Sequence, residues 1–420
     1  MGHLVGKDLY RKLGKKIDNL TVRVALNEKL YAILKELYTE EEARLVVSMP
    51  YGMSTLPQIQ KCTGIEKTKL KNMLDTLSDK GLLLDISIKN KYMYMISPMM
   101  IGVFEFTMMR TRGDLNVKEW ARLFHDYLED KEFYAKNFKG SHPTSFLRAM
   151  PYEETVKDSE HVEILDYEKA SEIIDRTKKF AVGICSCRHE KHHLGEKTCD
   201  VPLEKCSTLG NDIDYMVRHG FAREVSKSEM MDNLAESKDM GLIICADNVK
   251  KNVGFMCHCC GCCCNALMGI SKFGYPEVVV TSNYIASNDT DSCAECGECA
   301  EACPINAISL NDTNQPIIDE KFCLGCGVCG LQCSTESMKL VPRKQRVLHP
   351  ENTFERIIMQ SLEIGNLQNF MFSEPDKLNH KFMRGFVGGF LRLPPVKKAL
   401  LSDTLQSRFL NFMTNGQHRH

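Results

Sequence analysis

The N-terminal residues combine apolar and charged positions with a helical period. Between residues 1 and 38, apolar side chains recur three or four positions apart, and charged side chains fill the intervals. This spacing places the apolar side chains on one face of a helix. The positions concerned are Val24, Leu26, Leu30, Ile33, Leu34 and Leu37. We therefore expect residues 1–38 to form a helical segment that packs through this face.

Residues 39–97 predict three short helices followed by a β-hairpin. Thr39 precedes three glutamates, an arrangement that caps a helix and places acids at its positive end. Apolar and polar residues alternate on either side of Lys89-Asn90-Lys91, as two strands and a turn would require. The expected helices run from Thr39 to before Pro50, from Thr55 to Cys62 and from Glu66 to Lys80, and the expected strands cover 82–88 and 92–96.

Three helices and a β wing resemble the winged helix-turn-helix family, especially MarR-like domains. The resemblance implies that the third helix could read DNA, with phosphate contacts from the wing tip. The polar side chains concerned are Lys67, Thr68, Lys69, Lys71, Asn72, Lys89 and Lys91. However, seven lysines against four acids give residues 54–91 a net charge of only +3. DNA is therefore a possible partner that we do not favour, and protein docking is the alternative use of such a domain.

Two further segments have helical periodicity. Residues 101–165 predict a helical connector, in which Trp120 is expected to lie in the core. Residues 343–420 predict a helical, basic C-terminal region with eight Lys/Arg against two acids from Asp376 onward. Its apolar stripe contains Leu378, Phe382, Met383, Phe386, Val387, Phe390 and Leu391. The helix over 377–393 would either pack on the protein's own body or contact a partner or an anionic membrane surface.

Cysteine is concentrated in one part of the chain. Nineteen of the twenty cysteines lie between Cys185 and Cys333. The N-terminus has no charged-then-apolar signal layout, and no stretch approaches the roughly 20 apolar residues of a membrane span. We therefore expect a soluble, cytoplasmic protein, where reduced cysteines at this density indicate metal binding and not disulfides.

Two cysteine runs share the spacing C-x2-C-x2-C-x3-C. The runs are Cys293, Cys296, Cys299 and Cys303, and then Cys323, Cys326, Cys329 and Cys333. They resemble the bacterial 2[4Fe–4S] ferredoxin family, in which the fourth cysteine of each run ligates the other cluster. The resemblance implies one cluster on Cys293, Cys296, Cys299 and Cys333. It implies a second cluster on Cys323, Cys326, Cys329 and Cys303. The first run ends Cys303-Pro304, as in the family, but the second ends Cys333-Ser334.

An upstream cysteine field predicts at least one further metal centre. One group comprises Cys185, Cys187, Cys199 and Cys206, and a dense run comprises Cys257, Cys259, Cys260, Cys262, Cys263 and Cys264. Four thiolates suit either an iron–sulfur cluster or Zn²⁺. We favour iron–sulfur at the 185–206 site, with zinc as the alternative and His189, His192 and His193 as possible ligands. Arg188 would offset thiolate charge there. All six sulfurs of the dense run cannot converge on one ion, because adjacent side chains diverge. Three or four of them could ligate a further cluster, with the rest serving the 185–206 site.

These observations predict a multidomain α+β protein that carries electrons. The expected parts are an N-terminal helical segment (1–38), a winged-helix-like domain (39–100), a helical connector (101–165), a cysteine-rich metal-cluster domain (166–284), a (βαβ)2-like dicluster ferredoxin domain (285–342) and a helical basic C-terminal region (343–420). The module from Asp289 to Lys339 carries nine acids against two lysines, which suits docking on a basic redox partner.

We expect an electron-transfer protein, or the electron-transfer subunit of an anaerobic oxidoreductase. No nucleotide or flavin fingerprint accompanies the cysteines, so a catalytic role of the chain's own and its catalytic residues remain unassigned. The alternative is an iron–sulfur redox-sensing transcription regulator that uses the winged helix. No small-molecule substrate follows from the sequence.

Overall fold

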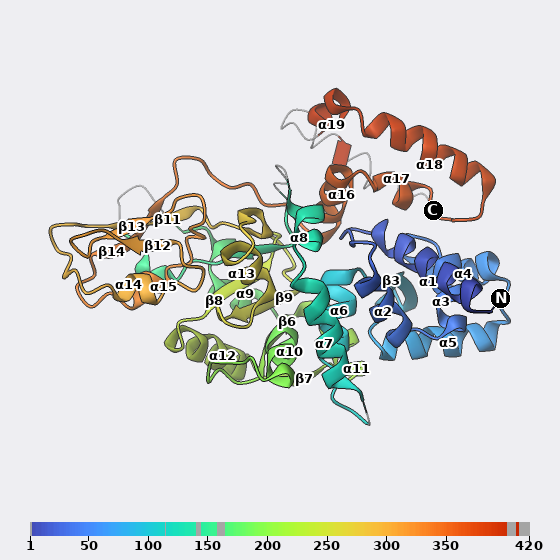
Figure 1. Cartoon of the computed structure of the whole chain (residues 1–420), viewed down its shortest axis with the longest axis horizontal. Helices are drawn as coiled ribbons and strands as arrows, with labels where there is room; N and C mark the ends of the chain where they lie inside the picture. Colours follow the sequence, from blue (N-terminus) through green and yellow to red (C-terminus); the bar gives the residue numbers. More distant parts are fainter. Residues whose placement is uncertain (1, 114, 140–143, 158–163, 401–408, 411–420) are drawn as a thin grey trace. The chain divides into compact units, whose positions relative to one another are not determined.

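The computed structural model of the chain is mixed α/β and divides into two compact units (Figure 1). It describes residues 2–113, 115–139, 144–157, 164–400 and 409–410, without the side chains of residues 2–8. The first unit joins residues 1–107 to residues 354–420, and the second comprises residues 108–353. None of the described helices combines the length and the apolar character needed to cross a bilayer.

The first unit contains the N-terminal helices and a small antiparallel sheet with strand order β1-β3-β2. Its N-terminal elements are α1 (Gly2–Asp18), α2 (Glu28–Leu37), α3 (Glu40–Ser48), β1 (Ser54–Thr55), α4 (Leu56–Thr63), α5 (Lys67–Asp79), β2 (Leu83–Ile88), β3 (Lys91–Ile96) and α6 (Phe104–Met108). Its C-terminal elements are α16 (Thr353–Ile364), α17 (Leu367–Met371), α18 (Leu378–Leu391) and α19 (Pro394–Leu400).

The helices and the hairpin expected over 39–97 are present. The Thr39 side chain accepts a hydrogen bond from the Glu42 N–H, and the Glu42 carboxylate accepts one from the Thr39 N–H. Lys89 and Asn90 both have positive φ, which suits the two-residue turn between β2 and β3. The resemblance of this segment to winged helix-turn-helix domains stays a prediction.

The helical segment expected over 1–38 consists of two helices, α1 and α2, and not of one. The chain leaves the helical path between α1 and α2, where the Asp18 carboxylate accepts a hydrogen bond from the Val24 N–H. Val24 is buried there, whereas Leu26 is exposed. A side-chain carboxylate that binds a nearby backbone N–H competes with helix formation, and periodicity alone does not show this.

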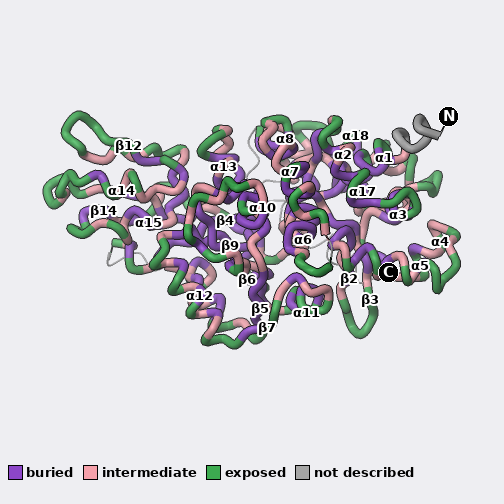
Figure 2. Tube along the Cα trace, turned by 60° about the horizontal axis from the view of Figure 1, so that its bottom comes forward, coloured by how far each residue is buried: buried purple, intermediate pink, exposed green. Residues whose placement is uncertain are grey.

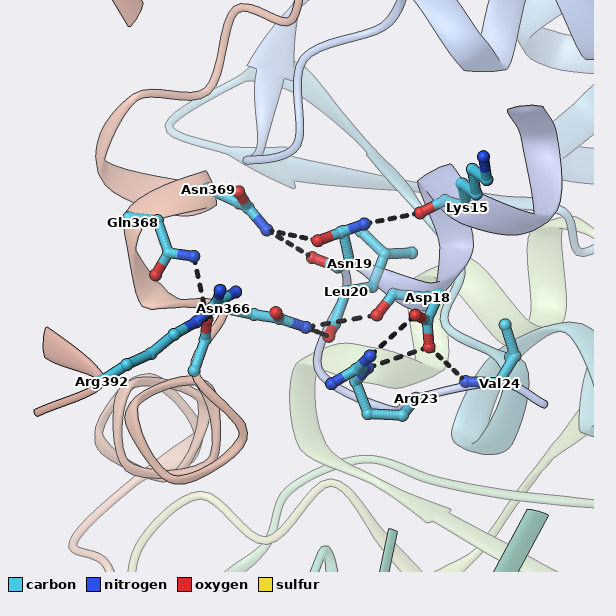
Figure 3. A network of polar contacts seen from close by, with 11 residues as sticks. Lys15, Asp18, Asn19, Leu20, Arg23, Val24, Asn366, Gln368, Asn369 and Arg392 are labelled. Atoms are coloured by element: carbon cyan, nitrogen blue, oxygen red, sulfur yellow. Dashed lines mark hydrogen bonds and ion pairs between the residues drawn. The ribbon is translucent and has the colours of Figure 1, made fainter. Parts of the chain in front are cut away.

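Figure 3 shows how the C-terminal segment is tied to this loop. The buried Asn366 side chain donates hydrogen bonds to the carbonyls of Asp18 and Leu20, at 3.2 and 3.1 Å. Asn369 donates to the carbonyl and the side chain of Asn19. These bonds supply hydrogen-bond donors to backbone carbonyls that are not paired within a helix or a sheet.

The apolar stripe of α18 divides into a packed row and an exposed row. Val387 and Leu391 pack with residues of α16 and α17. The exposed row comprises Leu378, Phe382, Phe386 and Phe390, with relative exposures from 54% to 82%. Packing on the protein's own body therefore accounts for only part of the predicted stripe.

The second unit is built on a seven-stranded sheet with strand order β10-β4-β8-β9-β6-β5-β7. Only the β10–β4 pair among them is parallel. The strands are β4 (Leu147–Ala149), β5 (Phe180–Ile184), β6 (Glu204–Leu209), β7 (Ala222–Val225), β8 (Ile243–Asp247), β9 (Phe255–Cys259) and β10 (Val279–Val280). Its helices are α7 (Val117–Leu128), α8 (Lys131–Phe138), α9 (Ala170–Arg176), α10 (Ser186–Leu194), α11 (Ile213–Arg218), α12 (Lys227–Asp239) and α13 (Asn265–Ser271).

The segment expected to be a helical connector also supplies a strand to this sheet. β4 pairs with β8, and the buried Arg148 guanidinium donates to the carbonyls of Asp247 and Tyr167. A three-residue strand is too short to give a recognisable period, so the sequence did not reveal it. Trp120 is buried on α7, as expected.

The ferredoxin-like segment contains two small antiparallel sheets and two short helices. β11 (Tyr284–Asn288) pairs with β14 (Met338–Pro342), and β12 (Ile308–Leu310) pairs with β13 (Pro316–Ile318). α14 (Glu298–Glu301) and α15 (Val328–Leu331) follow Gly297 and Gly327, which both have positive φ. Figure 2 shows that β5, β6 and β9 are largely buried, whereas the loop beside β12 is exposed.

Candidate metal centres

Four cysteines from the two ferredoxin-like runs line one hollow. Its walls include Cys293, Cys296 and Cys299 of the first run and Cys333 of the second, and it encloses about 310 Å³ of atom-free space that is partly open to solvent. These are the four residues that the ferredoxin resemblance assigns to one cluster. Thiol groups around an open space suit a cuboidal cluster, which is larger than a single ion.

The other four cysteines lie close enough to influence one another's ionisation. Burial raises the pKa of Cys326 well above its ordinary value, and Cys329, Cys303 and Cys323 raise it further. Burial and then Cys323 and Cys303 raise the pKa of Cys329 to about 12. Cys323 and Cys329 are buried, whereas Cys296 of the first hollow is exposed. The first set of cysteines is therefore nearer to solvent than the second.

A backbone N–H donates a hydrogen bond to the last cysteine of each run, and hydroxyl groups also contact Cys333. The Ala307 N–H donates to Cys303 Sγ at 3.2 Å, and the Met338 N–H donates to Cys333 Sγ at 3.4 Å. Cys333 Sγ also lies 3.3 Å from the Ser337 hydroxyl. Burial opposes ionisation, but hydrogen bonds from Ser337, Met338 and Thr335 lower the pKa of Cys333 to about 7. The run without a proline thus has extra donors at its last sulfur.

A second set of thiols, here called the four-cysteine group, joins two segments of the upstream field. It consists of Cys199, Cys260, Cys262 and Cys263, whose Sγ atoms all lie within 4.8 Å of one another. Cys199 Sγ lies 3.7 Å from Cys260 Sγ and 3.9 Å from Cys263 Sγ, and Cys262 and Cys263 are 3.5 Å apart. Val201 and Leu242 pack against these sulfurs.

The turn at residues 260–263, which contains three cysteines of this group, contacts the ferredoxin-like segment at Gly261. A Cβ atom added to Gly261 would lie 2.3 Å from the carbonyl oxygen of Pro304, the residue after Cys303. Only glycine permits backbone segments to approach this closely. Gly261 therefore brings the four-cysteine group next to the second set of ferredoxin cysteines.

The remaining upstream cysteines, here called the sheet thiols, gather around the central strands. Cys206, Cys257 and Cys245 are register partners across β6, β9 and β8, so their side chains share one face of the sheet. Cys264 Sγ lies 3.4 Å from Cys259 Sγ. Hydrogen bonds from Cys187 and Cys259 hold the pKa of Cys264 well below its ordinary value, although burial opposes this. The sheet thiols are Cys185, Cys187, Cys206, Cys245, Cys257, Cys259 and Cys264.

Arg188 connects the two upstream sets. Its guanidinium donates to Cys260 Sγ at 3.4 Å and to the His258 carbonyl at 3.0 Å. Burial opposes its charge, but Cys185 and Cys260 raise the pKa of Arg188 above its ordinary value. Hydrogen bonding from Cys263 and then the charge of Arg188 lower the pKa of Cys260 to about 5, against the effect of burial. The Arg188 charge thus lies beside Cys260 of the dense run, outside the 185–206 set for which the sequence suggested it.

The structure groups the upstream cysteines differently from the sequence analysis. Cys199 lies with the dense run, and Cys185 and Cys187 lie among the sheet thiols. Cys245 was missed as a candidate, because its membership follows from strand register and not from spacing. Among the candidate histidines, His189 contacts the Met108 carbonyl at Nδ1 and His193 at Nε2.

His258 lies within the dense cysteine run but faces the opposite side of β9. Its Nε2 lies 2.8 Å from the Ser207 hydroxyl, and Asn233 of α12 donates to the same hydroxyl. Burial, and then Lys205 and Arg188, lower the pKa of His258 to about 3, so this ring is neutral. It supports the strand and does not extend the thiol set.

The face of α5 that would read DNA carries several acids. Glu66 accepts hydrogen bonds from the N–H groups of Thr68 and Lys69 at the start of the helix. Lys69 pairs with Glu41, and Lys71 pairs with Asp75. A groove over this face is lined by Glu41, Glu42 and Glu66. Carboxylates at these positions repel phosphate, so the geometry does not strengthen the case for DNA binding beyond the small net positive charge of this segment.

Comparisons with known proteins match the ferredoxin-like part of the chain. A family model described as a 4Fe-4S binding domain matches residues 287–309. An uncharacterized ferredoxin of Methanocaldococcus jannaschii is 33% identical over 79 residues, which are 19% of this chain and 46% of that protein. No solved structure matches this chain.

Two further relatives are components of larger enzymes. A component of the Na(+)-translocating ferredoxin:NAD(+) oxidoreductase complex of Acetobacterium woodii is 31% identical over 86 residues, 20% of this chain and 26% of that component. The pyruvate synthase subunit PorD of Methanothermobacter marburgensis is 32% identical over 56 residues, 13% of this chain and 64% of PorD. The chain spans less than two thirds of each of these three relatives. The comparisons thus confirm a 4Fe–4S ferredoxin domain and do not extend to the rest of the chain.

We expect Gly261→Ala to destabilise the second unit. The added methyl group meets a backbone carbonyl, which cannot rotate away, so the turn must move off Pro304. Overpacking of this kind costs about 1–3 kcal/mol. Urea unfolding of the anaerobically purified full-length protein should show a lower midpoint. Gly389→Ala is the matched control, because its methyl group meets open space on α18. Equal midpoints for Gly261→Ala and the unmodified protein would contradict the packing argument.

Proposed function

We propose that this protein transfers single electrons through two [4Fe–4S] clusters, either alone or as a subunit of an anaerobic oxidoreductase. Cys293, Cys296, Cys299 and Cys333 would hold one cluster, and Cys303, Cys323, Cys326 and Cys329 would hold the other. Each cluster, when bound, would accept and release one electron at a time. The observation that carries the proposal is the hollow lined by cysteines from both runs, because this exchange of the fourth ligand is the dicluster arrangement.

The positions of the cysteines support a route for electron transfer. Cys296 is exposed, so the first set offers the edge at which a partner protein could exchange electrons. Cys323 and Cys329 are buried, and Pro304 beside the second set touches Gly261. Electrons would thus pass between the surface and the upstream cysteine field, where the sheet thiols are the candidates for a further iron–sulfur centre. The acidic surface of the module would steer a basic partner to the exposed edge.

Hydrogen bonding supports different reduction potentials for the two sites. Donors to cluster sulfurs stabilise the more negative, reduced state and so raise the potential. Cys333 has hydroxyl donors in addition to a backbone N–H, and its set is nearer to solvent. We infer that the site completed by Cys333 has the higher potential.

Two other roles can be tested directly. The comparisons do not support the alternative of a transcription regulator, and cluster-dependent gel shifts on duplex DNA would test it. Docking of 377–393 on a membrane surface or a protein is supported by the exposed row of α18 beside Lys377 and Lys381. Co-sedimentation with anionic vesicles would test the membrane, and no binding would dismiss it.

Cys326→Ala should remove one of the two clusters. We expect the iron content of anaerobically purified protein to fall by about four atoms per chain, because one four-iron centre loses a ligand. Iron and acid-labile sulfide analysis would measure this. Cys62→Ala is the control, since Cys62 lies outside the cysteine field. The proposal fails if redox-titrated EPR of the unmodified protein shows no reducible [4Fe–4S] signal.

Ser337→Ala should lower the potential of the cluster that Cys333 ligates. The expected shift is a few tens of mV, since about 1.4 kcal/mol between redox states corresponds to about 59 mV for one electron. An EPR-monitored redox titration would resolve one shifted and one unshifted component. Ser334→Ala is the control, because Ser334 is exposed. Unchanged potentials in Ser337→Ala would remove hydroxyl donation as the source of the difference.

A further inference from the structure

We propose that the four-cysteine group binds a single Zn²⁺ ion, separate from any iron–sulfur cluster. This inference does not depend on electron transfer by the ferredoxin module. It differs from the sequence-based expectation of iron–sulfur or zinc at residues 185–206, because the ligand set is a different one. The ligands are Cys199, Cys260, Cys262 and Cys263.

The sulfur spacing matches the edge of a tetrahedron around one metal ion. Zinc–sulfur bonds of about 2.3 Å place tetrahedral sulfurs about 3.8 Å apart. Three edges of the group measure 3.5, 3.7 and 3.9 Å, and all six are below 4.8 Å. One small ion would therefore reach all four sulfurs with little movement.

The ferredoxin cysteines provide a contrast within the same unit. Cys293, Cys296, Cys299 and Cys333 line a hollow that is partly open to solvent. All eight ferredoxin cysteines belong to the described residues, and no three of them have Sγ atoms mutually within 4.8 Å. A cube of iron and sulfide needs such an interior, and the four-cysteine group has no room for one at its spacing.

The chemistry of the surroundings suits a closed, structural zinc site. Four thiolates around Zn²⁺ leave a net charge of about −2, and such sites offer no open position for a substrate. Arg188 donates to Cys260 Sγ, and its charge offsets part of this excess. Val201 and Leu242 cover the sulfurs with apolar groups. Outer contacts of this kind orient the ligands of a metal.

The proposed ion would fasten two distant segments together. Cys199 and Cys260 are 61 positions apart in the chain. The turn from Cys260 to Cys263 is also the one whose Gly261 lies on the Pro304 carbonyl. Zinc would thus hold this turn in place against the ferredoxin-like segment.

Metal analysis of the anaerobically purified full-length protein tests the proposal. We expect about one zinc per chain in addition to the iron of the clusters. Cys262→Ser should lose this zinc and keep its iron, and Cys199→Ser should behave in the same way. Cys62→Ser should keep both metals. If the unmodified protein lacks zinc, or if the zinc persists in both ligand variants, the proposal is overturned.

Cobalt substitution gives a readout that does not depend on the folding of a variant. The unmodified protein, produced with Co²⁺ in place of Zn²⁺, should show the ligand-field and thiolate-to-metal bands of tetrahedral cobalt. These bands should disappear on addition of Zn²⁺. Failure to bind cobalt would overturn the proposal, as would a loss of about four iron per chain in Cys199→Ser together with zinc-free unmodified protein.

Discussion

The convergence of many thiol groups in a buried space is the constraint on which the second unit depends. Thiolates repel one another, and burial disfavours their charge, as the pKa of Cys185, raised to about 12, illustrates. Arg188 supplies one positive charge to this region. Metal ions would supply the rest, and their ligands deprotonate as they bind. Such binding would link the stability of this unit to its metal content, since binding to the folded site favours folding.

The two faces of strand β9 in the seven-stranded sheet have different environments. Alternate residues of a strand face opposite sides. On β9, Cys257 and Cys259 face the thiol side, whereas His258 between them contacts Ser207. The neutral His258 and its polar partners fill the space toward α12 without adding charge. The run Cys257-His258-Cys259 thus presents its thiol groups on one face of the strand and its imidazole on the other.

The sequence allowed some features to be predicted well and others not. The cap at Thr39 and the turn at Lys89-Asn90-Lys91 were predictable, because both act through residues close in the sequence. The shared hollow of Cys333 and the first ferredoxin-like run agrees with the spacing of the two runs, which indicates such an arrangement from the sequence alone. The upstream grouping was not predictable, because Cys199 meets its partners through tertiary contacts and Cys245 through strand register. The strand at 147–149 was also hidden, since three residues give no period.

The close approach of Cys259 and Cys264 bears on how the protein can be handled. Their sulfurs are 3.4 Å apart, and the pKa of Cys264 is held low by its hydrogen bonds. A thiolate beside a second thiol is readily oxidised to a disulfide. A disulfide between these two residues would remove both sulfurs as metal ligands. Metal-free protein in that form would need a reductant before iron and sulfide, so the order of additions would decide whether reconstitution succeeds.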